Sequence, residues 1–390
     1  MSEENKDNQI EDVVSYNSNA DIDFELDIPE LPEPAPEEPS QDIEDNFDAS
    51  FKFAFIGVGQ GGSRVAETFH KMGYRKVCAI NTAQQDLNTI NLEDNRKLCI
   101  GEGGAGKNPK KAGLKFDERK DDVIDFMRKN FGKKMDRVFV CAGGGGGTGT
   151  GCAVRTAEAI KEMLSLSDIE CTSKKIGLIL TLPKISEGKK VCSNAAGALK
   201  VAYDAVKEGL ISPLIVIDNE KINSLYPNLA VGKFWDTANR SIAGLFHLFN
   251  MTANKDSSFS SFDANDYRQV LDSGMLSFGA SPVKEWKDTF AISKTVRDNL
   301  KNNLLTGGID LSSANSAGVI VIGSNEILNE LPQENLDHAF EQFSRMMKGN
   351  STVHRGIYSG TKPTLTVYTC MGGFDSPEEK IGQLKKYASS

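Results

Sequence analysis

A run of glycines between an apolar segment and an amphipathic one most constrains how this chain can fold. Residues 138–142 read VFVCA, and the nine residues Gly143–Gly151 that follow contain seven glycines and two threonines. Apolar residues then recur at a 4-3-4 spacing over residues 153–164, which is typical of one face of a helix. Each glycine in ordered structure costs about 0.5–1 kcal/mol relative to alanine. We therefore interpret the run as a tight loop between a buried strand and a helix, and not as a flexible linker.

Such a loop is suited to binding an anion. Consecutive backbone N–H groups at a helix N-terminus form a cradle, and the absence of Cβ atoms lets phosphate oxygens approach the main chain. The helix end adds roughly half a positive charge. Thr148 and Thr150 offer hydroxyl donors. The sequence therefore predicts a loop in which backbone N–H groups contact phosphate oxygens.

Strand-like and helix-like segments alternate along the first half of the body. The patterns FKFAFIGV, KVCAI, MDRVFVCA, IGLILTL and PLIVID are separated by helix patterns near residues 62–72, 121–130, 153–164 and 191–208. This order predicts an α/β fold with a Rossmann-like parallel sheet and a ligand at the carboxyl ends of its strands. After a long helix at 233–249, the strand patterns AGVIVIG, STVHRGIYSG and TLTVYTC and a helix at 336–348 predict a smaller α+β domain joined through the long helix.

Charge divides the chain further. Residues 1–50 contain 17 acidic residues and one lysine, a net charge of −16, which leaves +7 for the remainder of a chain whose total is −9. We expect a disordered acidic tail at 1–50. The α/β domain follows at 51–232, then the central helix at 233–255, the C-terminal domain at 256–375 and a short, frayed tail at 376–390.

Cysteine and histidine usage excludes some classes of site. Seven scattered cysteines without a CxxC pair predict reduced thiols and a cytoplasmic protein. The four histidines have no metal-ligand spacing, so we expect no histidine metal site. No apolar run approaches the roughly 18 residues of a membrane span, and we expect none.

Two further glycine motifs offer alternatives. GVGQGG at Gly57–Gly62 fits the dinucleotide pattern, which expects an acid about 20 residues later. Asn81 and Thr82 occupy that place, which argues against a nicotinamide cofactor and a dinucleotide-binding oxidoreductase. GEGGAGKN at Gly101–Asn108 approaches the P-loop pattern. Its last residue lacks the hydroxyl that binds Mg²⁺, and no clear strand precedes it.

The segment GGGTGTG at Gly145–Gly151 resembles the signature loop of the tubulin/FtsZ superfamily of polymerising GTPases, and the similarity extends over nearly all of residues 51–375. The resemblance implies the tubulin/FtsZ fold with a GTP-binding domain at 51–232. It also implies hydrolysis of GTP to GDP and phosphate with the help of Mg²⁺, and head-to-tail assembly of the protein with itself into filaments. A member that binds GTP as a switch without polymerising is the alternative.

The resemblance assigns nucleotide contacts loop by loop. IGVGQGGSR resembles the first phosphate loop, NT and GAGKNP the next two, and SEGKK the ribose loop with its carboxylate at Glu187. An aromatic ring that stacks on the base at Trp235 and amides that pair its edge at Asn219 and Asn239 suit guanine. The full expected set is Gln60, Gly61, Gly62, Ser63, Arg64, Asn81, Thr82, Gly104, Ala105, Gly106, Gly145, Gly146, Gly147, Thr148, Gly149, Glu187, Asn219, Trp235 and Asn239.

The segment SFDANDYR at Ser261–Arg268 resembles the family's catalytic loop, with Asp263 and Asp266 in the D-x-x-D positions. In the family this loop completes the active site of the next subunit. A carboxylate pair arriving there can polarise the attacking water and help to hold the cation. A solvated acidic turn is the alternative interpretation of the pair.

Some positions depart from the pattern of the family's division proteins. Val191 stands where arginine is usual, so that one phosphate or ribose contact is either lost or taken over by Lys189 or Lys190, and Ser261 stands where asparagine is usual. We expect no long linker and docking peptide of the division FtsZ kind after residue 375, and the extra segment is N-terminal and acidic. These features favour a relative of the TubZ or phage-tubulin segregation type over a cell-division protein, with archaeal tubulin-like proteins as a further alternative. Both chain ends are candidate adaptor contacts, and nucleic acid would be contacted indirectly if at all.

Overall fold

The computed structural model describes residues 45–167, 175–225, 230–301, 309–347 and 351–389. Most of the expected acidic tail, residues 1–44, lies outside these ranges. Residues 45–50 were expected to belong to that tail, yet they lie against the body. The Phe47 ring is 4.7 Å from the rings of both Tyr74 and His247. This contact partly buries the Phe47 ring, so the packed body begins before residue 51.

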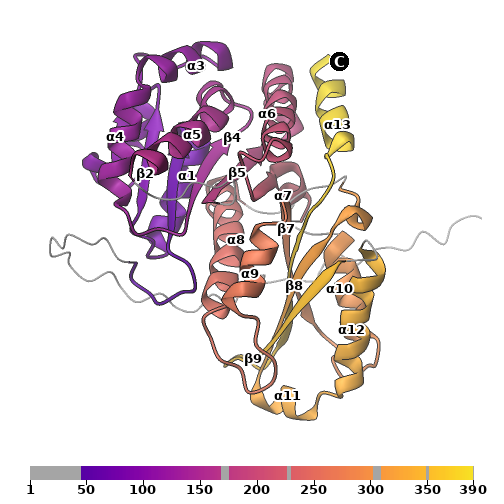
Figure 1. Ribbon diagram of the computed structural model, residues 1–390. Helices are drawn as coiled ribbons and strands as arrows, with labels where there is room; N and C mark the ends of the chain where they lie inside the picture. The colour runs from indigo at the N-terminus through magenta and orange to yellow at the C-terminus, as the bar shows by residue number, and fades with distance from the viewer. Residues whose placement is uncertain (1–44, 168–174, 226–229, 302–308, 348–350, 390) are drawn as a thin grey trace, which may run out of the picture.

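Ten strands of the described chain form one sheet, in the order β3-β2-β1-β4-β5-β6-β7-β10-β8-β9 (Figure 1). The strands from β3 to β7 pair in parallel, β10 is antiparallel to both β7 and β8, and β9 is parallel to β8. Their bounds are β1 (Phe53–Val58), β2 (Val77–Asn81), β3 (Lys97–Cys99), β4 (Arg137–Gly143), β5 (Ile176–Leu182), β6 (Leu214–Asp218), β7 (Met275–Val283), β8 (Ser316–Gly323), β9 (Thr352–Ser359) and β10 (Leu365–Gly372). The sequence patterns missed β3 and β7.

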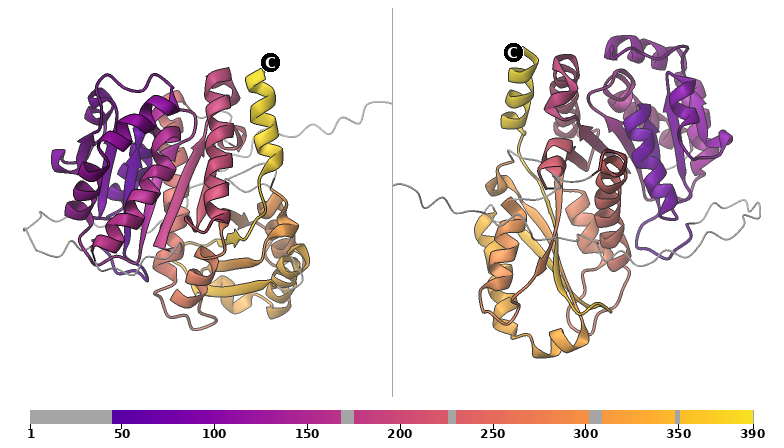
Figure 2. Two further views of the ribbon diagram at one scale, coloured as in Figure 1. Left: turned by 45° about the horizontal axis from the view of Figure 1, so that its top comes forward. Right: turned by 180° about the vertical axis from the view of Figure 1, so that it is seen from behind.

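Helices cover both faces of this sheet (Figures 1 and 2). They are α1 (Gly59–Lys71), α2 (Gln84–Asn88), α3 (Pro109–Glu118), α4 (Lys120–Phe131), α5 (Gly147–Leu166), α6 (Lys189–Lys207), α7 (Asn219–Leu225), α8 (Val231–Thr252), α9 (Ala264–Leu271), α10 (Ala291–Lys301), α11 (Asn325–Glu330), α12 (Gln333–Met346) and α13 (Glu378–Ser389). Among the described residues, no helix has the length and apolar character needed to cross a bilayer.

Alternation along the strands divides the core between the two faces. In β1, Ala54 and Ile56 join the core beneath α4, α5 and α6, whereas Phe53 and Phe55 join the core beneath α1 and α8. Phe246 of α8 contacts several of these rings, including those of Phe53 at 5.0 Å. Buried aromatic pairs of this kind stabilise beyond their buried area, and they hold α8 against the sheet.

The two halves of the molecule are joined more directly than expected. α8 runs between them (Figure 1), as the sequence predicted, but β6 also pairs in parallel with β7 through Leu214–Met275 and Ile215–Leu276. The sheet of the first half therefore continues into the second. A rigid connection follows, because backbone hydrogen bonds as well as a helix span the boundary.

The expected frayed tail at 376–390 is wrong for residues 378–389, which form α13. This helix lies beside α6 (Figure 2). Ile381 and Leu384 are 2% and 1% exposed. Two buried aliphatic side chains favour docking over fraying, at roughly 1.5–3 kcal/mol each.

Candidate functional site

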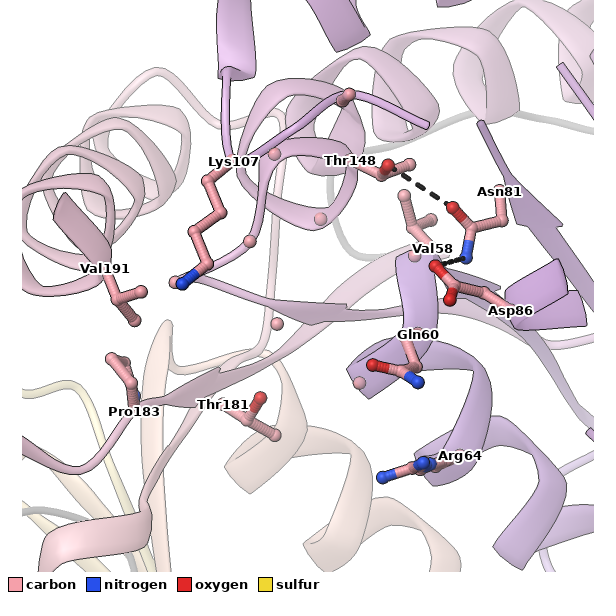
Figure 3. A pocket seen from close by; sticks show the side chains of 18 of the residues that line it. Val58, Gln60, Arg64, Asn81, Asp86, Lys107, Thr148, Thr181, Pro183 and Val191 are labelled. Carbon is pink, nitrogen blue, oxygen red and sulfur yellow. Dashed lines mark hydrogen bonds between the residues drawn. The ribbon is translucent and has the colours of Figure 1, made fainter. Parts of the chain in front are cut away.

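A cavity of about 590 Å³ lies at the carboxyl ends of β1, β2, β4 and β5 and is bounded by α7 and α8 (Figure 3). Ligands bind at this end of parallel α/β sheets. The cavity brings together all the expected nucleotide residues except Gly62 and Ser63. Its lining includes Gln60, Gly61, Arg64, Asn81, Thr82, Gly104, Ala105, Gly106, Gly145, Gly146, Gly147, Thr148, Gly149, Glu187, Asn219, Trp235 and Asn239.

Gly62 and Ser63 lie inside α1 and not on the cavity wall. A Cβ atom at Gly62 would lie 1.9 Å from the Cys141 carbonyl oxygen, so this glycine lets α1 pack directly on β4. Ser63 is fully buried, and within the described chain its hydroxyl has no hydrogen-bond partner. The first turn of α1 therefore directs these two residues toward the sheet, and their contact with a nucleotide stays a prediction.

Two helices begin at the cavity without a side-chain cap. α1 follows Val58 and α5 follows Gly146; neither residue makes a cap hydrogen bond, and neither first turn contains an acid. Uncapped helix N-termini carry unsatisfied N–H donors and roughly half a positive charge each. Two of them at one cavity make a site for a polyanion.

The glycine run is only partly a loop, which corrects the interpretation of the sequence. Residues 147–151 form the first turns of α5. A Cβ atom at Gly149 would lie 2.3 Å from the Gly143 carbonyl oxygen, and one at Gly151 would lie 2.2 Å from the Pro109 carbonyl oxygen. These two glycines are therefore required by the packing of α5 on β4 and on the start of α3, whatever the cavity binds.

Gly146 has a different environment. A Cβ atom built there would meet nothing within 4 Å, and the residue lines the cavity. Thr148 lines the cavity too, but the Thr150 hydroxyl donates to the Gly144 carbonyl and is not part of the lining. Of the two expected hydroxyl donors, Thr148 thus lines the cavity, and Thr150 instead bonds the backbone of the glycine run.

A chain of hydrogen bonds leads to Asp86, which the sequence interpretation did not include. The Thr82 and Thr148 hydroxyls are 2.8 Å apart, and Thr148 donates to Asn81 Oδ1 at 3.3 Å. Asn81 Nδ2 then donates to an Asp86 carboxylate oxygen at 3.1 Å (Figure 3). Asp86 lines the cavity. The signal for it was its place in the NTAQQD segment that follows the second strand and enters α2.

Lys107 supplies a cation that was also missed. It lines the cavity opposite Gln60 and Arg64 (Figure 3) and has a left-handed φ of 57°. A residue with a Cβ atom is strained there by roughly 1–2 kcal/mol. The Asn194 side chain donates to the Lys107 carbonyl at 3.0 Å, which holds this conformation.

Residue 191, where arginine is usual in the family's division proteins, places an apolar valine side chain at the cavity. Val191 lines the cavity, and neither Lys189 nor Lys190 does. Of the two alternatives, this lining favours loss of the contact over its takeover by Lys189 or Lys190. Lys107, on another loop, carries the nearby positive charge (Figure 3).

The loop that carries Lys107 does follow a strand, contrary to expectation. β3 ends at Cys99 and α3 begins at Pro109, so the strand–loop–helix order of a P-loop is present. The difference from a P-loop rests on Asn108, whose side chain accepts the Lys111 N–H at 3.2 Å and caps α3. This helix N-terminus is thus occupied by its own chain.

The opposite wall carries the residues expected at the ribose and base. Glu187 lies in a 3₁₀ turn, and one of its carboxylate oxygens accepts the Lys184 N–H at 2.8 Å. Trp235 is 37% exposed and lies one helical turn before Asn239 on α8, while Asn219 begins α7. An aromatic face, a carboxylate and two amides therefore meet at this wall.

α13 is connected to the same wall through a buried ion pair. Lys380 Nζ lies 2.5 Å from Asp218, and the two side chains are 5% and 3% exposed. Asp218 also accepts the Glu220 N–H at 3.1 Å, and Glu220 accepts the Ile185 N–H at 2.8 Å. The C-terminal helix thereby contacts the strand end before Asn219 and, through Glu220, the turn that carries Glu187.

Asp263 and Asp266 do not line the cavity. The Asp263 carboxylate accepts the N–H groups of Asn265 (2.8 Å) and Asp266 (2.9 Å), and Asp266 Oδ2 accepts the Asp263 N–H at 3.2 Å. The D-x-x-D spacing thus forms the capping box of α9. The sequence analysis considered a solvated acidic turn as the alternative role of this pair, and the structure shows instead a capping box at the start of α9.

α8 separates the acidic pair from the cavity. Asn239 lines the cavity, and Phe249, ten residues further along the helix, packs on Tyr267 of α9 with ring centroids 6.0 Å apart. At 1.5 Å per residue, α8 rises roughly 15 Å between the two. The acidic pair and the cavity therefore lie near different parts of α8.

Comparison with known proteins identifies relatives. Residues 52–227 match the model of the Tubulin/FtsZ family, GTPase domain. The chain is 28% identical to Tubulin-like protein TubZ of Bacillus cereus over 264 residues, which cover 62% of this chain and 58% of TubZ. It is 24% identical to Cell division protein FtsZ 2 of Haloferax volcanii over 300 residues, covering 72% and 68% of the two chains. The match thus spans less than two thirds of the length of TubZ.

A solved structure extends the likeness to nearly the whole fold. The GTPγS-form protofilament of TubZ from Bacillus thuringiensis serovar israelensis matches with a TM-score of 0.76 and 17% identity, covering 88% of this chain and 92% of that one. At this identity the likeness shows the fold. The fold class expected from the sequence is confirmed.

Proposed function

Because this chain belongs to the Tubulin/FtsZ family, with its GTPase domain at residues 52–227 within a TubZ-like fold, we propose that it binds and hydrolyses GTP and polymerises head to tail. In this proposal each active site combines the cavity of one subunit with the acidic pair of the next.

The phosphates bind where α1 and α5 begin. The backbone N–H groups near Gly61 and Gly146 donate to phosphate oxygens, and both helix ends favour negative charge. Arg64 and Lys107 add positive charge from two sides of the cavity (Figure 3). A neutral sugar or a cation would bind weakly here, because neither carries the negative charge that the helix ends and the two basic side chains attract.

Guanine binds at the opposite wall. Trp235 stacks on the base, and the amides of Asn219 and Asn239 provide donors and an acceptor for its edge. Glu187 accepts from ribose hydroxyls. A site built to hydrogen-bond a particular edge discriminates strongly against a base that leaves those groups unpaired.

Mg²⁺ fits the site as an ion bound mainly to the phosphates. In the part of the chain that the structure describes, no three His, Cys, Asp or Glu side chains are grouped as a metal cage. Mg²⁺ commonly binds one or two carboxylates together with waters and substrate phosphates. Asp86 of the same subunit and the acidic pair of the next would hold it, and the ion would neutralise charge on the phosphates.

The observation that carries the assembly proposal is that Asp263 and Asp266 do not line the cavity, while α8 rises roughly 15 Å from Asn239 at the cavity to Phe249, which packs on α9. A carboxylate outside the cavity cannot act on a nucleotide that its own chain holds there. Placed by a neighbour, it orients a water that attacks the γ-phosphorus and accepts that water's proton, while the bond to the β–γ bridging oxygen breaks. Such a head-to-tail contact does not close on itself and gives a filament.

Mixing two inactive variants tests this proposal. Asp266→Asn keeps an oxygen for the capping box but lowers catalysis by about 10²–10⁴-fold. Gly146→Glu places a carboxylate at the anion site and blocks GTP binding. In an equimolar mixture about one quarter of the contacts join an intact cavity to an intact acidic pair, so turnover should return to about one quarter of the wild-type value.

The control is co-assembly, measured by pelleting a tagged copy of each variant with the other. A mixture that pellets together but stays inactive would contradict a shared active site. Wild-type turnover per molecule should also rise with protein concentration. A flat dependence would indicate a GTP-binding switch that acts as a monomer.

We further propose that the filament serves DNA segregation or positioning, as the resemblance to the TubZ group implies, and not cell division. A fluorescent fusion should form filaments that move with a DNA element, and its loss should raise the frequency of cells lacking that element. Filaments confined to division sites would contradict this role.

A further inference from the structure

β9 provides a side chain that contacts Asp266 directly. His354 Nδ1 lies 2.7 Å from Asp266 Oδ1, and the two side chains are 9% and 24% exposed. His354 Nε2 is buried and has no hydrogen-bond partner in the described chain. A neutral ring with its proton on Nδ1 accounts for both facts, because it donates to the carboxylate and leaves no buried N–H without an acceptor.

The two oxygens of Asp266 are held by different elements. Oδ1 receives the His354 contact from β9, and Oδ2 accepts the Asp263 N–H at the start of α9. The capping box alone would leave the carboxylate free to rotate about one hydrogen bond. The second contact fixes its plane, which a capping role does not need.

The same strand seats the loop that leads to the acidic pair. Tyr358 Oη accepts the Phe262 N–H at 2.7 Å and donates to the Phe262 carbonyl at 3.2 Å. The Ile357 N–H donates to the Ser260 carbonyl at 2.8 Å. A Cβ atom at Gly356 would lie 2.8 Å from Phe262 Cβ, so glycine lets the loop approach the strand. β9 therefore serves as a template for residues 260–266.

We propose that His354 is a positioning residue for GTP hydrolysis, which orients the Asp266 carboxylate toward the nucleotide of the neighbouring subunit. The inference rests on the proposed function, since Asp266 acts only on GTP held by another copy. His354 itself does not touch the nucleotide. Its effect is on the catalytic step, because a reacting group displaced by about 1 Å can cost 10²-fold in rate.

Two substitutions at this position separate positioning from packing. His354→Leu has similar bulk but no donor, and His354→Asn places an amide N–H where Nδ1–H was. His354→Leu should lower kcat by about 10- to 100-fold. The affinity of the monomer for GTP and pelleting with a slowly hydrolysed analogue should change less than about twofold, because neither involves the orientation of the water. His354→Asn should recover kcat to within about threefold of wild type.

The matched control is His338→Leu, which changes a histidine on α12 that is 37% exposed in its side chain and pairs with Glu334. It should leave turnover unchanged. Unchanged turnover in His354→Leu, or an equal loss in His354→Leu and His354→Asn, would overturn the proposal.

A spectroscopic measurement tests the contact without any activity. The imidazole ¹⁵N resonances of the monomer, assigned by the loss of one of the four histidines in His354→Asn, should show a ring protonated on Nδ1. That signal should shift in Asp266→Asn; an unchanged signal would refute the contact. A wild-type protein without GTP turnover would instead contradict the proposed function, and the two failures are thereby distinguished.

Discussion

A methyl group at Gly146 would project into the cavity, and one at Gly151 would meet the Pro109 carbonyl oxygen at 2.2 Å. The two glycines are five positions apart in the sequence. The backbone at Gly146 has φ −79° and ψ 175°, a conformation that alanine adopts freely. Ligand access and helix packing thus require glycine at different residues of one run.

Alanine should therefore affect mainly stability at position 151 and mainly GTP binding at position 146. Gly151→Ala should lower the free energy of unfolding by about 1–3 kcal/mol, because the added methyl overpacks against backbone. Gly146→Ala should leave stability within about 0.5 kcal/mol and weaken GTP binding by about tenfold, because the methyl holds the phosphates off the N–H groups. Urea unfolding without nucleotide and fluorescence titration with GTP measure the two effects. Equal losses of stability in both variants would contradict the distinction.

At the scale of elements, α13 connects the end of the chain to the cavity wall that carries Glu187 and Asn219. Its buried Lys380–Asp218 pair has side chains 5% and 3% exposed, so neither charge is solvated by bulk water. Removing one partner of a buried pair is far more damaging than replacing both, because it leaves an uncompensated charge. The pair also holds the Asp218 carboxylate that accepts the Glu220 N–H.

Substitution of this pair should therefore be non-additive. Lys380→Met should lower the free energy of unfolding by about 3–5 kcal/mol and weaken GTP binding. The double variant Lys380→Met/Asp218→Asn should recover most of the stability, since asparagine still accepts from Glu220 and carries no charge. Urea unfolding of the wild type, both single variants and the double variant gives the coupling energy. Additive losses would show that the pair does not act as a unit.

At the scale of the whole molecule, a buried histidine should lower the free energy of unfolding as the pH falls. His247 is 2% exposed and lies between Phe47 and Tyr74, whose hydroxyl is 3.2 Å from Nδ1. Burial and the charge of Lys255 lower the pKa of His247 to about 4. Between about pH 6.5 and pH 4, His247 is therefore protonated in the unfolded chain, whose histidine pKa is near 6.5, but not in the folded chain.

This difference in pKa sets the direction in which stability changes with pH. The contribution of His247 is fully present above about pH 6.5 and is lost as the pH falls toward 4. Between pH 7 and pH 5 it should cost about 2 kcal/mol of unfolding free energy. Burial also lowers the pKa of His70, which acts in the same direction.

Urea unfolding at pH 7, 6 and 5 measures this loss. His247→Gln carries no charge at any of these pH values, so its stability should fall less steeply than that of the wild type, whatever its value at pH 7. Parallel slopes for the two proteins would exclude His247 as the source.

Some of this protein could be predicted from the sequence because the signals are local. The strands that flank the cavity are apolar runs, and the α5 pattern has a clear helical period. β3 and β7 were missed because β3 has only three residues and β7 contains Gly279 and Pro282, so pairing with neighbouring strands defines them.

The sequence by itself predicted the fold class and the place of the glycine loop, since periodicity and a glycine run are properties of neighbouring residues, and the resemblance to a family supplied the residues expected at a nucleotide. The tertiary structure alone decided which glycines of the run are held by packing and that Asp86 and Lys107 join the cavity. It also decided that His354, 88 positions after Asp266 in the numbering, contacts that carboxylate. Such contacts depend on how distant segments pack, and a one-dimensional pattern carries no record of that packing.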